Sequence, residues 1–223
     1  FRDRVTDERL KAEIAGFMGQ EAIHGREHDK LNELLESRGI DLRVPIAAVK
    51  LGLGAMERLP ASTQLAATTF MEHFTALLAE QLLTDPQFRA KADPEMLKLW
   101  QWHALEELEH KAVAFDVYEL VGNTERERAA AALAVAVTLV PAAVFSWAWL
   151  VAREGTWRDR RDVAHGVRIL LGRGGFVSRI LPKMGLFNRK GYHPNKHDTR
   201  ALERATRERF FGADGIMNDE FRN

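Results

Sequence analysis

Hydrophobic side chains recur along most of this chain at spacings of three and four residues, within stretches rich in Ala, Leu, Glu and Arg. That period places the apolar residues on one side of an α-helix, and no stretch shows the strict alternation typical of a β-strand. The pattern therefore predicts an all-α fold. We expect helices over about residues 8–37, 41–58, 62–83, 94–121, 125–153 and 198–211.

Residues that begin or end helices fall between these segments. Asp7 can cap the first helix, and Gly39 suits its end. Asp85-Pro86 and Asp93-Pro94 lie between the third and fourth segments. Because proline is tolerated in the first turn of a helix and not in its interior, they mark the end of the third segment and the start of the fourth. Short connections between helices of this length predict a helical bundle.

Charge divides the chain into three parts. Residues 1–128 carry 16 basic and 23 acidic side chains, residues 129–152 carry none, and residues 153–200 carry 12 basic and 4 acidic ones. An acidic front and a basic rear indicate modules that face different surroundings. We therefore expect a helical bundle over 1–124, an apolar helix or helical hairpin over 125–153, and a basic C-terminal extension over 154–223.

The overall composition excludes several classes of protein. Lys+Arg and Asp+Glu balance at 32 each, so the total charge does not indicate a nucleic-acid partner. The absence of cysteine excludes disulfides, thiolate metal sites and iron–sulfur clusters, and it fits a reducing compartment. Residues 1–11 are charged where a secretory signal would be apolar, so we expect a cytoplasmic protein.

Ala129 to Ala152 form a run of 24 residues without a charge. Length alone permits a transmembrane helix, but Pro141 lies at its centre. A single span would also export the acidic bundle if the basic segment stayed inside, and no export signal is visible. Three interpretations stay open: peripheral or monotopic attachment to the inner membrane, a buried helix pair, and a homodimer interface.

Two of the predicted helices each carry a Glu-x-x-His motif with a second histidine one turn away. At 100° per residue, positions spaced by three or four and by seven share one helix face. These faces consist of Glu21, His24 and His28 in the first helix, and of His103, Glu107 and His110 in the fourth. One such motif is common on a solvated helix, whereas two with apolar flanks favour a metal site.

A third helix adds Glu72 among apolar neighbours, where a buried carboxylate is costly unless it is paired or ligated. Two Glu-x-x-His motifs with a further Glu are the arrangement of di-iron and di-manganese carboxylate bundles, which have the ferritin-like fold. Oxygen and imidazole ligands suit iron or manganese, with zinc as an alternative. We therefore predict two divalent metal ions, with iron favoured, within residues 1–124.

The predicted metal ligands are Glu21, His24, Glu72, Glu107 and His110. The residues that could add a ligand or orient one are His28, His103, Glu106 and Glu80. Such a site should have one more carboxylate from a fourth helix. We expect it from a helix upstream of Phe1.

The same stretches resemble the bacterial family of predicted metal-dependent hydrolases, a ferritin-like group. The similarity lies in GFMGQEAIHGREH at 16–28, EHFTA at 72–76 and, most specifically, LWQWHALEELEHKAVAFD at 99–116. It is close from about residue 1 to 122 and loose afterwards. The resemblance implies a metal-dependent enzyme, and an upstream Gly-Glu motif that would supply the further carboxylate.

Three functions follow from these patterns. The apolar segment and the carboxylate-rich ligands slightly favour an oxygen-activating di-iron oxidase or hydroxylase acting on a small apolar or lipid-like substrate. The first alternative is a hydrolase in which metal ions activate water against an ester or phosphoester. The second alternative is a non-enzymatic, metal-binding protein attached to a membrane.

Overall fold

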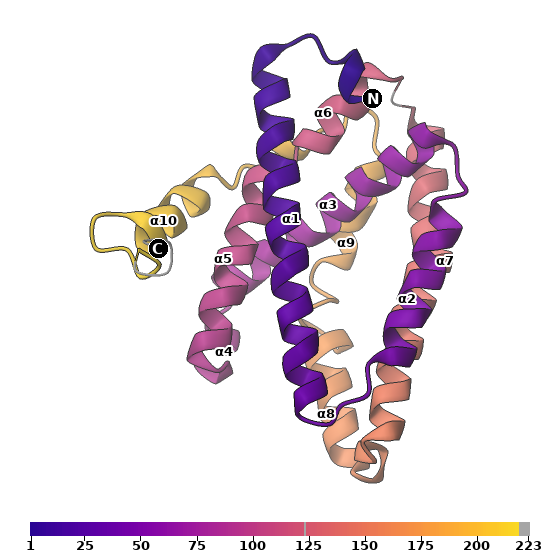
Figure 1. Cartoon of the computed structure of the whole chain (residues 1–223), viewed down its shortest axis with the longest axis vertical. Coiled ribbons are helices and arrows are strands. Elements are labelled where there is room, and N and C mark those ends of the chain that lie inside the picture. The colour runs from indigo at the N-terminus through magenta and orange to yellow at the C-terminus, as the bar shows by residue number, and fades with distance from the viewer. Residues whose placement is uncertain (123, 219–223) are drawn as a thin grey trace.

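The computed structural model describes residues 1–122 and 124–218, and this part of the chain is all-α, as predicted, with no β-strand (Figure 1). Its α-helices are α1 (Glu8–Ser37), α2 (Arg43–Met56), α3 (Ala61–Thr84), α4 (Pro86–Lys91), α5 (Pro94–His110), α6 (Val113–Leu120), α7 (Glu125–Arg153), α8 (Arg160–Leu171), α9 (Leu181–Met184) and α10 (Arg200–Phe211). Short 3-10 helices are η1 (Arg2–Arg4), η2 (Thr156–Arg158), η3 (Gly185–Asn188) and η4 (Pro194–Lys196).

Aspartate side chains cap α1 and α5, as the sequence predicted, and also α4, a short helix that the sequence did not predict. The carboxylate of Asp7 accepts the backbone N–H of Leu10 at 2.9 Å, which satisfies one of the free donors at the start of α1. Asp85 and Asp93 cap α4 and α5 in the same way, each followed by proline in the first turn. Local sequence therefore fixes where these helices start.

The helix expected over 94–121 is divided into two in the structure. The chain leaves the α-helix at Lys111 and Ala112, and α6 then takes a different direction from α5. This change of direction brings Val113 and Val117 of α6 against Leu10 and Ile14 of α1, in one buried apolar cluster. The break therefore anchors the N-terminal end of α1.

Small side chains bring α3 and α5 close together at the centre of the bundle. Ala76 and Ala79 of α3 pack with Ala104 and Leu108 of α5 in a buried cluster. α1 crosses in front of this pair (Figure 1), with His24 3.6 Å from Glu107 of α5 and Glu21 close enough to Glu72 of α3 for their charges to interact. Buried polar residues of the three helices meet at this crossing.

The apolar segment forms one helix, α7, so the hairpin alternative does not occur. Pro141 lies inside α7, where its ring removes a single backbone donor. α2 packs alongside α7, and a Cβ on Gly52 would lie 3.1 Å from a methyl carbon of Leu139. Glycine at this position therefore permits the close approach of the two helices.

The region after α8 packs back against the bundle. Phe187 is fully buried, with its ring 5.2 Å from that of Phe70 and 5.3 Å from that of Tyr192, measured between centroids. The buried guanidinium of Arg128 donates to the backbone oxygens of Phe187 and Arg189, both at 2.9 Å. Through Phe187 and Tyr192, the basic C-terminal region therefore packs into the core of the bundle.

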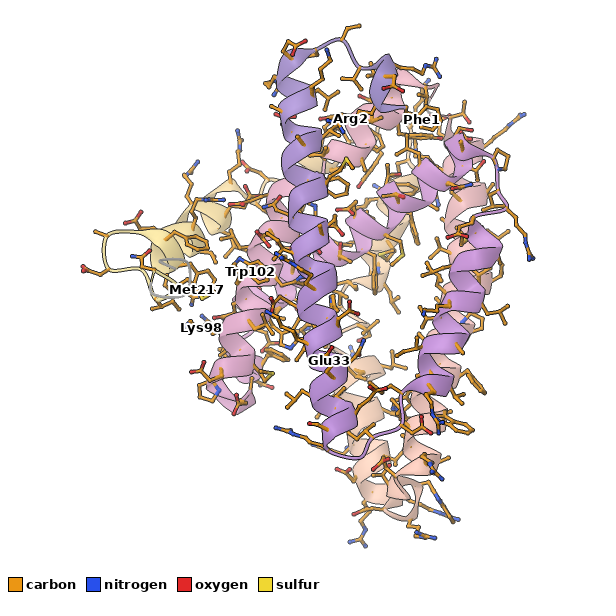
Figure 2. All side chains as sticks on the ribbon, viewed as in Figure 1. Phe1, Arg2, Glu33, Lys98, Trp102 and Met217 are labelled. Carbon is orange, nitrogen blue, oxygen red and sulfur yellow. The ribbon has the colours of Figure 1, made fainter. Side chains whose placement is uncertain are left out.

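The last helix covers the outer face of α5. Trp102 and Leu105 of α5 form a buried cluster with Phe210 of α10 and with Met217 (Figure 2). This packing leaves the opposite face of α5 to meet α1 and α3. α5 therefore makes apolar contacts with α10 and with α3, and polar contacts with α1 and with Glu72 of α3.

We predict that Phe187→Ala destabilises the protein by about 3–5 kcal/mol, because it removes a fully buried ring and leaves a cavity between α3 and α7. Urea unfolding followed by circular dichroism measures the change. Leu181→Ala is the control, since Leu181 is 55% exposed and its truncation should cost less than about 0.5 kcal/mol. Equal effects of the two substitutions would contradict the packing described.

Candidate metal centre

Carboxylates and imidazoles from α1, α3 and α5 converge where these helices cross. Glu21, His24, Glu107 and His110 each offer one ligand atom, and the four atoms lie within 4.8 Å of one another. His24, Glu107 and His110 are buried, whereas the side chain of Glu21 is 42% exposed. The group is therefore closed on the bundle side and accessible beside Glu21.

His24 is held by a carboxylate on one nitrogen and faces the group with the other. Its Nε2 lies 2.7 Å from an oxygen of Glu106, a distance at which Nε2–H donates a short hydrogen bond. Its Nδ1 is buried without a hydrogen-bond partner, 3.7 Å from Glu21 and 3.6 Å from Glu107. The Nδ1 lone pair is thus free to bind a cation.

His110 repeats this arrangement with its nitrogens exchanged. Its Nδ1 lies 3.0 Å from an oxygen of Glu72, which places the donated proton on Nδ1. Its Nε2 is buried without a hydrogen-bond partner, 3.4 Å from Glu21. A metal-binding histidine usually donates a hydrogen bond from its second ring N–H to a carboxylate in this manner, which fixes the ring orientation.

The lack of a hydrogen-bond partner at these two buried nitrogens indicates whether the residues fit a metal ion. Burying a polar atom without a partner costs roughly 1–3 kcal/mol, and such atoms are rare in folded proteins. Both orphaned imidazole nitrogens of the described chain belong to this one group. Nitrogen and oxygen donors at this spacing fit a divalent cation such as iron, manganese or zinc.

The charge balance supports the same fit. In the described part of the chain, the ion pairs of Glu21, Glu72, Glu106 and Glu107 are with imidazoles. Burial, with the neighbouring charge of Glu72 as a further cause, raises the pKa of the Glu21 carboxyl. Burial raises the pKa of Glu107 as well. A divalent cation would compensate this negative charge directly.

The two histidines of α5 have pKa values shifted in opposite directions, because carboxylates surround His110 and do not surround His103 in the same way. Burial alone would lower the pKa of His110, but the hydrogen bond to Glu72 and the carboxylate charges outweigh it, so the pKa is raised. Burial, reinforced by His24 and His28, lowers the pKa of His103 to about 3. His103 is therefore a neutral imidazole at physiological pH.

The structure brings most of the predicted site residues together, but only some of them face the centre of the group. Glu21, His24, Glu107 and His110 form the inner group. Glu72 and Glu106 contact the outer nitrogens of the two histidines. His103 lies beside the group, with its Nε2 3.3 Å from Glu107, and exposed His28 lies outside it against the rings of His103 and Trp100.

Glu80 does not join the group. Its carboxylate pairs with Lys183 at 3.1 Å and with His197 at 2.9 Å, on the side of α3 where the C-terminal region packs. His73 and Lys111, which follow directly after Glu72 and His110, line a cavity of about 300 Å³ on that same side. The site and this cavity therefore lie on different faces of α3 and α5.

Two residues near the site carry hydrogen bonds that the motifs do not indicate. The amide of Gln20 donates to Glu106 at 3.3 Å. The hydroxyl of Thr75 donates to the backbone oxygen of Glu72 at 3.3 Å, from where it lowers the pKa of the Glu107 carboxyl against the larger effect of burial. Gln20 lies one turn before His24, and Thr75 lies one turn after Glu72. Helical spacing from the motif residues was the signal that could have identified both.

A second cluster of possible ligands lies on α6 and in the segment before η4. It consists of Asp116, Glu119 and His193. These side chains are partly exposed, and Nε2 of His193 already pairs with Asp116 at 2.9 Å. The cluster lacks the buried, unpartnered nitrogens of the first group.

The fold and this group of ligands define an all-α protein with a candidate metal centre at a helix crossing. Comparison with models of protein families matches residues 1–198 to the family described as predicted metal-dependent hydrolase. The match covers most of the chain, and the chain belongs to this family. It extends well past residue 122, beyond the region in which the sequence resemblance was close. Searches of curated proteins and of solved structures found no significant match.

We predict that Glu107→Gln or His110→Ala weakens metal binding by more than about 100-fold, because each removes a donor atom from the inner group. Glu106→Gln should weaken it by about 10–100-fold, through the orientation of His24. Metal titration with calorimetry measures each change. Glu109→Gln is the control, since Glu109 pairs with Arg207 on another face of α5. A larger loss in this control would show that the helix phase is wrong.

We also predict that removing metal loosens α1. In its middle and C-terminal parts, His24 is the one buried residue of α1, so a metal ion would join α1 to α5 there. Chelation should increase tryptic cleavage after Arg26 and Lys30 by at least about tenfold, because a ligand at 100 times its Kd contributes about 2.7 kcal/mol. Cleavage after Arg204 of α10 should not change. Equal cleavage at Arg26 with and without chelator would contradict the prediction.

Proposed function

We propose that this chain is a metal-dependent hydrolase that cleaves an ester or phosphoester. The observation that carries this proposal is the convergence of two buried, unpartnered imidazole nitrogens with Glu21 and Glu107. Membership of the family of predicted metal-dependent hydrolases supports the same reaction class.

The chemistry requires a bound ion and an oriented set of side chains. A divalent metal ion would lower the pKa of a water molecule and polarise a carbonyl or phosphoryl oxygen. His24 and His110 would hold the ion through their inner nitrogens, while Glu106 and Glu72 keep the two rings in the required tautomers. Because Glu21 is the exposed member of the group, the substrate would approach beside it.

The four residues of the inner group suffice for one ion. A second ion, as the sequence predicts, would need Glu72 and Glu106 to turn from the imidazoles toward the centre. Their present contacts, at 3.0 Å and 2.7 Å, favour the orienting role. We therefore propose one firmly held ion, with dinuclear occupancy as an outcome of metal analysis.

The surroundings of the imidazoles favour an apolar substrate. The ring of Phe17 lies 4.9 Å from His110, Trp102 lies 5.5 Å from His24, and Trp100 lies 5.7 Å from His103, measured between centroids. Of these rings, partly exposed Phe17 and Trp100 would contact an acyl or alkyl group, whereas buried Trp102 would exclude water from the donors. We propose a small ester or phosphoester with an apolar group.

The slight preference for oxidation that the sequence indicated gains no support. Carboxylate and imidazole ligands serve both chemistries, and the family description names hydrolysis. Oxygen dependence is therefore the measurement that separates the two reactions.

The proposal predicts turnover of chromogenic carboxylic or phosphoric esters by protein loaded anaerobically with Mn²⁺, Zn²⁺ or Fe²⁺. His110→Ala should lower kcat/KM by at least about 100-fold, because it removes a donor to the ion that activates water. Glu109→Gln should retain the activity of the parent. Rates are followed by nitrophenolate release, with oxygen consumption recorded in parallel by an electrode.

Two results would overturn the proposal. One is oxygen consumption coupled to substrate loss, with no hydrolysis under anaerobic conditions. The other is stoichiometric metal binding without turnover across ester and phosphoester panels that differ in chain length, which would indicate a metal-binding protein that is not an enzyme.

A further inference from the structure

Large apolar side chains are exposed together on one part of the molecule, formed by α2, α7 from Leu133 onward, η2 and α8, which we name the apolar arm. Of the 20 exposed large hydrophobic residues in the described chain, 14 lie on these four helices. The most exposed of them on α2, α7 and α8 are Leu51, Leu133, Val137, Val144 and Leu171. A monomeric soluble protein rarely exposes so many large apolar side chains on neighbouring helices.

The shape of α7 decides how this surface could meet a membrane. α7 is long and apolar enough to cross a bilayer by length and composition. However, Arg128, Ala131 and Val135 at its N-terminal end are buried inside the bundle. The remaining residues, 136–152, extend about 25 Å at 1.5 Å per residue, which is less than the hydrocarbon core of about 30 Å. α7 therefore does not fit a simple span.

Charged residues border the apolar arm without entering its α7 face. Residues 129–152 carry no charge, whereas residues 153–162 carry four arginines interspersed with Glu154, Asp159 and Asp162, and residues 163–190 carry six basic side chains and no acidic one. A helix seam for a second protein chain normally has charged positions along its edges, and this face has none. An apolar surface with arginines at one end is typical of proteins that bind an anionic lipid surface.

α8 has the form of an interfacial helix. None of its residues is buried, and Val163, Val167 and Leu170 follow one another at spacings of four and three on one face. Arg161 and Arg168 lie seven residues apart on another face. An amphipathic helix of this kind lies in the plane of the headgroups, with its arginines toward water and phosphate.

We propose that the apolar arm docks this protein onto one leaflet of an anionic bilayer, with α7 and α8 partly immersed and the arginines after α7 at the headgroups. The folded bundle holds Arg128 and the start of α7 outside the lipid. The metal group lies on α1, α3 and α5, outside the arm, so docking does not require any residue of that group.

Flotation with vesicles tests the docking without reference to enzymatic activity. The protein should float with phosphatidylglycerol-containing vesicles, and the double variant Val140→Asp with Val144→Asp should reduce the floating fraction at least about tenfold, since a carboxylate in hydrocarbon is costly. The two valines are 54% and 57% exposed. The control is Leu120→Asp with Ile216→Asp, at positions 53% and 49% exposed outside the arm, and it should float like the parent.

A second measurement needs no charged variant. Trp147 and Trp157 are 46% and 51% exposed on the arm, so brominated lipid should quench their fluorescence. Trp147→Phe with Trp157→Phe should reduce the quenching to the part that comes from Trp149, the half-buried third tryptophan of the arm, because Trp100 and Trp102 lie on α5 outside the arm.

Three outcomes would overturn the proposal. The first is no flotation with any vesicle, and the second is equal flotation of the arm variant and the parent. The third is a parent dimer in analytical ultracentrifugation that the arm variant converts to a monomer, without vesicle binding, which would assign the arm to a second copy of this chain.

Discussion

The attachment of α1 to the rest of the bundle depends on the buried polar contact around His24. The buried apolar residues of α1, Leu10 and Ile14, lie near its N-terminal end and pack against α6, and further along partly buried Ile23 packs against the cluster of α5 and α10. Beyond them, the ring of His24 is enclosed by Glu21, Glu106 and Glu107. An apolar core would hold α1 without any need for these groups, and burying them is costly unless they are paired or ligated. The polar contact is therefore best understood as a site for a cation.

The same contact links three levels of the structure. Alanines at 76, 79 and 104 bring α3 close to α5, which sets Glu72 within hydrogen-bond distance of His110. The packing of α10 on the far face of α5 turns Glu107 and His110 toward α1. The carboxylates of α3 and α5 then fix which nitrogen of each histidine is free. Packing between helices thus determines the tautomers on which metal binding would rest.

Much of the fold and of the inner group could be predicted from the sequence, because helical periodicity and the Glu-x-x-His spacing are local properties. The capping aspartates and the shared faces of Glu21 with His24 and Glu107 with His110 belong to this class. The break at Lys111 could not be predicted, since it depends on the contact of α6 with α1. The positions of Glu72 and Glu106 outside the inner group depend on how three helices cross, which no single motif encodes.

The metal group and the apolar arm lie on separate parts of one chain, which would separate the proposed chemistry from the proposed membrane attachment. The bundle helices carry the buried donors, while α2, α7 and α8 carry the exposed apolar surface. Anomalous diffraction from a metal-loaded crystal tests the central claim most directly. An ion within about 2.0–2.2 Å of His24 Nδ1 and His110 Nε2 is the predicted result. An ion bound elsewhere, for example at Asp116 and His193, with these two nitrogens unligated, would contradict the account.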